Sequence, residues 1–163
     1  MGSEIARLID LFQRVHDGDP WHGPSLMSVL EGVTAAQAAA RPVPGAHSIW
    51  ELVLHVIAWR GEVMRRISGG QAALPEEGDW PEVPDRTEEA WTAALERLRV
   101  TSEAVTASLA TLDESHLDAR VHDDRDRALG TGQTFYVTLH GLVHHDAYHG
   151  GQIALLKKAL QGA

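Results

Sequence analysis

Apolar residues recur three and four positions apart through most of the chain, which is the spacing of amphipathic helices. The first such stretch follows Ser3, a residue type that favours the N-cap position. The predicted long helices cover residues 4–16, 48–68, 87–109 and 134–160, and short helical pieces are expected at 25–30, 34–40 and 111–119. The pattern therefore predicts four long helices with short helical pieces in their connections.

Local signals support these boundaries. Ser48 followed by Glu51 has the spacing of a capping box at a helix start. The acidic, proline-punctuated stretch 71–86 is about sixteen residues long, which exceeds a routine connection and suggests a functional lid or flank. Residues 120–133 are polar and contain glycine, so a loop is expected there. No segment alternates as a strand does, and only residues 134–139 are ambiguous. The fold class is therefore all-α, a four-helix bundle.

Composition narrows the function. A length of 163 residues suits one domain spanning residues 1–163. The net charge of −9 argues against nucleic acid as a partner. The chain has no leader-like apolar segment and no apolar run of about 18 residues, so we expect a cytoplasmic protein that does not enter membranes. The absence of cysteine excludes disulfides and thiolate metal ligands. The ten histidines make imidazole the candidate metal ligand.

The last predicted helix carries four of these histidines, at positions 140, 144, 145 and 149. At about 100° per residue, His145 and His149 share a sector of roughly 80° with the apolar residues of the helix. His140 and His144 point nearly the opposite way, toward solvent or an interface. Two imidazoles at i and i+4 have Cβ atoms about 6 Å apart, so both can reach one metal ion. A satisfied pair of core histidines is the alternative, but the inward face favours metal binding.

Two histidines leave a divalent ion short of ligands, because catalytic zinc sites usually have three protein ligands and water. His55 is the candidate for the third position, since it lies within about 60° of Leu52 and about 40° of Trp59 on the second long helix. The predicted site is one divalent ion bound by His55, His145 and His149. Zinc and nickel are favoured, with iron and manganese as alternatives, because three imidazole nitrogens do not specify one metal.

Other side chains are weaker candidates for orienting the ligands or lining the pocket: Asp146, Gln152, Tyr148, Glu51, His22 and His47. Gln152 lies nearly one turn beyond His149, whereas Asp146 is expected to be exposed or in an ion pair. His22 and His47 precede helices in loops, and the sequence does not decide whether either reaches the site. His16, His116 and His122 receive no functional assignment.

Two segments resemble the DinB-like superfamily. The final-helix segment HHDAYHGGQIALLKKAL (144–160) is similar to its C-terminal signature, and AHSIWELVLHVIAW (46–59) is similar to its second-helix segment. Residues 20–45 and 79–95 fit in order and spacing, so the resemblance covers nearly the whole chain. It implies an up-down-down-up bundle, the same three histidine ligands and a homodimer.

The resemblance also implies a class of activity. Members are similar to thiol-dependent S-transferases and to a mycothiol-dependent maleylpyruvate isomerase, and many are described as metal-dependent hydrolases or DNA-damage-inducible proteins. We expect a metal-dependent enzyme that activates water or a low-molecular-weight thiol against a small electrophilic substrate, in stress or detoxification. The alternative is a non-catalytic metal-binding stress-response module, whose ion would be a structural clamp. Catalytic residues other than the metal ligands are not identified. Because the chain has no cysteine, any reacting sulfur must come from a small molecule.

Overall fold

The computed structural model describes residues 2–83, 85–122 and 124–162, and these residues form an all-α fold. Within them, strand-like pairing is confined to an isolated bridge between Arg120 and Thr134. The long helices are α1 (Glu4–His16), α4 (Ile49–Ile67), α5 (Glu88–Ala110) and α6 (Phe135–Gln161), and the short ones are α2 (Leu26–Leu30), α3 (Ala35–Ala39) and the 3-10 helix η1 (Glu114–Asp118). Among the described residues, no helix combines the length and the apolar character that a membrane span requires.

The helices begin where the sequence places a hydroxyl side chain. At five helix starts the N-cap hydroxyl accepts a hydrogen bond from a backbone N–H of the first turn: Ser3, Thr34, Ser48, Thr87 and Thr134. The Ser48–Glu51 capping box is present with both of its hydrogen bonds. Thr134 caps α6, so residues 135–139 of the ambiguous stretch belong to a helix, and only Thr134 itself makes a strand-like bridge.

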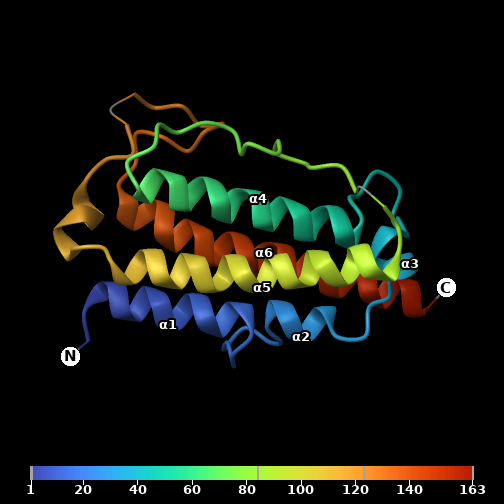
Figure 1. The fold of residues 1–163 in the computed structure, drawn as a ribbon. Coiled ribbons are helices and arrows are strands. Elements are labelled where there is room, and N and C mark those ends of the chain that lie inside the picture. The colour runs from blue at the N-terminus through green and yellow to red at the C-terminus, as the bar shows by residue number, and fades with distance from the viewer. Residues whose placement is uncertain (1, 84, 123, 163) are drawn as a thin grey trace.

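The long helices pack around a common interior, in which α4 and α1 each contact both α5 and α6. Figure 1 shows α4 and α5 running in one direction and α1 and α6 in the other. Because α4 and α5 run the same way, the chain that joins them must return along the whole bundle. Residues 71–83, which we call the crossover segment, do so alongside α4 (Figure 1). This return path explains the length of the connection and brings the segment over the middle of α4.

The apolar interior is divided by a buried polar layer. One apolar cluster surrounds Trp50 near the start of α4, and another surrounds Phe12 near the end of α4. Between them lie the side chains of Arg60, Asp146 and His16, all buried. The layer falls at mid-bundle, at the level of the predicted histidine ligands on α6. Apolar packing on both sides therefore fixes the helices that carry these ligands.

Candidate metal centre

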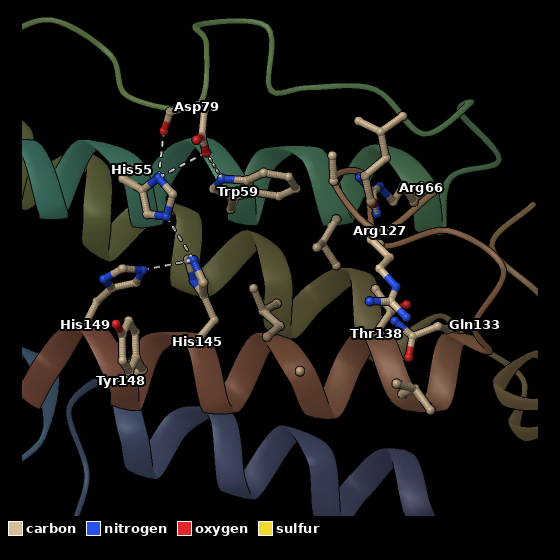
Figure 2. A pocket seen from close by; sticks show the side chains of 17 residues that line it. His55, Trp59, Arg66, Asp79, Arg127, Gln133, Thr138, His145, Tyr148 and His149 are labelled. Atoms are coloured by element: carbon tan, nitrogen blue, oxygen red, sulfur yellow. Dashed lines mark hydrogen bonds and ion pairs between the residues drawn. The ribbon is translucent and has the colours of Figure 1, made fainter. Parts of the chain in front are cut away.

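Three histidines from two helices meet at mid-bundle. His55 comes from α4, whereas His145 and His149 lie one turn apart on α6. The Nε2 atom of His145 is 3.0 Å from Nε2 of His55 and 3.1 Å from Nε2 of His149 (Figure 2). One ligand nitrogen of each lies within 4.8 Å of the others, so this histidine triad can hold a metal ion. The helical phase of the sequence thus predicts which histidines come together.

The outer ring nitrogens of two of these histidines have hydrogen-bond acceptors. The Nδ1–H of His55 donates to the backbone carbonyl of Asp79 at 2.6 Å, and the Nδ1–H of His149 donates to Oε1 of Gln152 at 2.7 Å. A proton on Nδ1 of a neutral imidazole leaves Nε2 as a lone pair. Both acceptors therefore set the tautomer in which Nε2 faces the centre of the triad, as is common for metal-binding histidines.

His145 faces a different acceptor. Its Nδ1 lies 3.8 Å from Oδ1 of Asp146, too far for a hydrogen bond, and neither atom has a hydrogen-bond partner among the described residues. The second oxygen of Asp146 accepts two hydrogen bonds from Arg60, at 3.0 and 2.7 Å. Both side chains of this ion pair are fully buried. Exposure of Asp146, one of the two sequence expectations, is therefore wrong, and the ion pair is the arrangement found.

Burial controls the protonation of the site. Burial, together with the charge of a protonated His145 nearby, lowers the pKa of His149 to about 4. Burial also lowers the pKa of His55. For Asp146, burial favours the neutral acid, but Arg60 and His145 outweigh it and the pKa is lowered. Near neutral pH, His55 and His149 are therefore neutral, and a carboxylate stands behind His145.

This arrangement suits a cation. With Nδ1 of His55 and His149 protonated, at most one hydrogen, on Nε2 of His145, can lie among the three central nitrogens. Two nitrogens that bind one ion at about 2.0–2.1 Å in tetrahedral geometry are about 3.3 Å apart, close to the separations found. The donor set, its tautomers and its spacing therefore fit a divalent metal.

A cavity of about 480 Å³, which we call the main cavity, opens beside the triad. Apolar side chains such as Val63 and Leu142 form much of its wall, and two arginines, Arg66 and Arg127, also line it (Figure 2). The nearby carboxylate of Asp79 accepts a hydrogen bond from Trp59 Nε1 at 2.7 Å. Over residues 2–83, 85–122 and 124–162, the group of possible metal ligands contains the three histidines and no fourth residue.

A second cavity of about 430 Å³, the side cavity, shares His149 and Tyr148 with the main cavity. Trp80 of the crossover segment lines only the side cavity. Its ring stacks on His55 with centroids 4.0 Å apart and on His47 with centroids 3.5 Å apart. Trp80 therefore lies between the two imidazoles and shields one face of His55.

Of the weaker candidates for the pocket, some lie at the triad or its cavities and others do not. Gln152 contacts a triad histidine, and Tyr148 lines both cavities. His47 reaches the side cavity through its stack on Trp80. His22 is exposed and lines neither cavity, and Glu51 is occupied by the cap of α4 and by Arg41.

The other pair on α6 lies away from the triad. His140 is half-buried and lies 3.3 Å from Glu4, and His144 is exposed. The rings of the two pairs thus point to different sides of α6, as the helical phase predicts.

Sequence reasoning did not single out four residues at or near the site: Arg60, Asp79, Trp80 and Arg127. One of the four could have been found from the sequence. Arg60 interrupts an almost wholly apolar stretch of α4, and an arginine buried there needs a partner. Asp79 and Trp80 lie in a loop, where helical periodicity gives no direction.

The contact between Gln152 and His149 leads to a testable expectation. We expect Gln152→Ala to weaken divalent-metal affinity about 10- to 100-fold, because such partners hold the ligand ring and its tautomer. Gln161→Ala, at the exposed end of the same helix, is the matched control and should leave the affinity unchanged. Competition with a chromogenic chelator measures both. Equal affinities for the two variants would contradict a role for Gln152.

The fold and the site together define a helical bundle whose interior carries a three-histidine group able to hold a metal ion. The chain belongs to the DinB superfamily, whose family model matches residues 21–153. Its fold is similar to that of a conserved protein from Enterococcus faecalis known from a crystal structure, with a TM-score of 0.73, 15% identity and complete coverage of both chains. At that identity the likeness concerns the fold. No curated protein matches the sequence.

Proposed function

We propose that this protein is a metal-dependent enzyme, a thiol S-transferase or hydrolase, whose ligands are His55, His145 and His149. One observation carries the proposal: three imidazole nitrogens converge beside a cavity, and the described residues provide no fourth ligand. Structural zinc sites are usually closed by four protein ligands, whereas catalytic sites keep one position for water or substrate. The arrangement thus supports an open site over a structural clamp.

The chain's own residues prepare the site. The carbonyl of Asp79, the amide of Gln152 and the carboxylate of Asp146 each face the outer nitrogen of one triad histidine. Trp59 and Trp80 lie close to His55, and Trp80 limits access of water to one of its faces. A divalent ion bound there, with zinc or nickel favoured and iron or manganese as alternatives, would supply Lewis acidity that lowers the pKa of a water or thiol.

The two cavities favour transfer between two small molecules. Both include His149 and Tyr148, so compounds in the main and side cavities would both contact His149. A hydrolase needs room for one organic substrate and water, whereas an S-transferase needs room for a thiol and an electrophile. The sulfur must come from a small molecule, because the chain has no cysteine.

Chelation tests the proposal. We expect the metal-loaded protein to accelerate the reaction of a small thiol with monochlorobimane, or the hydrolysis of p-nitrophenyl esters. Prolonged dialysis against EDTA should abolish the acceleration, and one equivalent of zinc or nickel should restore it, because the metal supplies the chemistry. Acceleration that survives full removal of the metal would exclude the proposal. The thiol and ester assays together distinguish transfer from hydrolysis.

A further inference from the structure

The main cavity has a cationic side chain that pairs with none of the residues that the structure describes. Of its two arginines, Arg66 is buried and fully engaged: its guanidinium donates to the Glu62 carboxylate at 2.8 Å and to the backbone carbonyls of Leu129 at 2.7 Å and Ala73 at 3.3 Å. Its charge is therefore balanced within the protein. Arg66 therefore forms part of the wall, whereas the second arginine has no such partner among residues 2–83, 85–122 and 124–162.

Arg127 is that second arginine. Its side chain is exposed, and no hydrogen bond or ion pair joins its guanidinium to any other residue that the structure describes. The neighbouring acid, Asp126, accepts instead from the backbone N–H groups of Ala128 and Leu129. Figure 2 shows Arg127 beside Gln133 and Thr138, away from the histidines. A positive charge and the amide of Gln133 thus lie together in the same cavity as the triad.

The spacing along α6 gives the length of a ligand that would reach both groups. Thr138 and His145 are seven residues apart on this helix, which corresponds to about 10 Å along its axis. Between them, Gly141 and Leu142 line the cavity, and the position of a Cβ at Gly141 has no atom of another element within 4 Å. The path between the two ends is therefore open and largely apolar.

We propose that Arg127, assisted by Gln133, binds the carboxylate or phosphate group of a small, elongated ligand whose opposite end reaches the histidine triad. The ligand carries its anionic group about 10 Å from the atom that meets the triad, with an apolar chain between them. A planar guanidinium suits such an anion, because it can donate two parallel hydrogen bonds. This inference rests on the proposed function, since it names the class of compound that the same site takes.

Matched thiols test the inference. The protein loaded with Co²⁺ is titrated with 8-mercaptooctanoic acid, 8-mercaptooctylphosphonic acid and 8-mercaptooctan-1-ol, which share one chain length and differ in the far group. The sulfur-to-cobalt absorption band reports binding without any turnover. We expect the two acids to bind about tenfold or more tightly than the alcohol, equivalent to about 1.4 kcal/mol, and their order shows which anion is preferred. 3-Mercaptopropanoic acid, too short to reach Arg127, should lack this advantage.

Two arginine variants complete the test. Arg127→Gln should remove the advantage of the acids and leave the Kd of the alcohol unchanged, which also shows that the site has folded. Arg120→Gln changes an exposed arginine that follows η1 and does not line the main cavity, and it should keep the advantage. Raised salt should reduce the advantage in the parent protein.

Three results would overturn the inference. One is equal affinity of acids and alcohol in the parent, and another is an advantage that persists in Arg127→Gln. Both would leave the proposed function intact, because a sulfur-to-cobalt band would still form. Failure of every thiol to give the band would overturn this inference together with the thiol form of the proposed function.

Discussion

Replacing His145 or His149 with alanine is expected to abolish stoichiometric binding of a divalent ion, and His55→Ala should do the same. Each removes one of three nitrogens that converge within hydrogen-bonding distance, and two imidazoles leave the ion with too few protein ligands. We expect the purified parent protein to bind one ion per chain and each variant to lose at least about a thousandfold in affinity. Elemental analysis and isothermal titration calorimetry measure occupancy and affinity.

The chain contains its own control. His140 and His144 repeat the i, i+4 spacing on the same helix but lie off the triad, so His140→Ala and His144→Ala should retain the metal. Full occupancy in His55→Ala would contradict the three-ligand set, and loss of the metal in His144→Ala would contradict the assignment by helical face.

Acid offers an independent check of the same ligands, because only neutral imidazole binds a metal. Burial lowers the pKa of His149 to about 4 before any ion is present. The bound ion also competes with the proton for each ring nitrogen, so the metal should be retained from pH 7 down to about 4 and released only at lower pH. The release is followed by titration with a fluorescent zinc indicator that functions in acid. Retention of the ion at about pH 2, where unbound imidazole is fully protonated, would argue against ligation by histidine.

The triad could be predicted from the sequence because helical phase is a local property. His145 and His149 lie on the apolar stripe of α6 and His55 on that of α4, so packing the two stripes together brings the rings together. The helix starts could also be predicted from the sequence, because each hydroxyl N-cap bonds to a backbone N–H only a few residues further along the chain. Both results depend on regular periodicity and on chemistry close in sequence.

The surroundings of the triad could not be predicted in the same way. Asp79 and Trp80 reach His55 because the crossover segment returns along α4, and no local pattern encodes that path. Asp146 lies off the main apolar stripe of α6, which made exposure plausible. However, α6 packs against α1, α2 and α4, so the side of the helix that carries Asp146 is also covered. Arg60 reaches it from α4, a pairing 86 residues apart in sequence.

The buried ion pair gives the second large expected effect. Asp146→Asn should lower the free energy of unfolding of the metal-free protein by about 3–5 kcal/mol, because it leaves the fully buried Arg60 without a counter-charge. Urea unfolding followed by circular dichroism measures the change. The control is Arg97→Met, which breaks an ion pair with Glu77 of similar length, 2.7 Å, but half exposed on both sides. It should cost no more than about 1 kcal/mol.

A double variant separates the structural role of this pair from its effect on the metal site. Arg60→Met combined with Asp146→Leu removes both charges and fills the space with apolar atoms, so much of the lost stability should return. Metal affinity should nevertheless stay about 10- to 100-fold below that of the parent, because Nδ1 of His145 has lost the carboxylate that faces it at 3.8 Å. Parent-like affinity in the double variant would mean that Asp146 stabilises the fold without positioning His145. A stable protein with weakened metal binding would instead establish that the polar layer between the two apolar clusters supports the metal site.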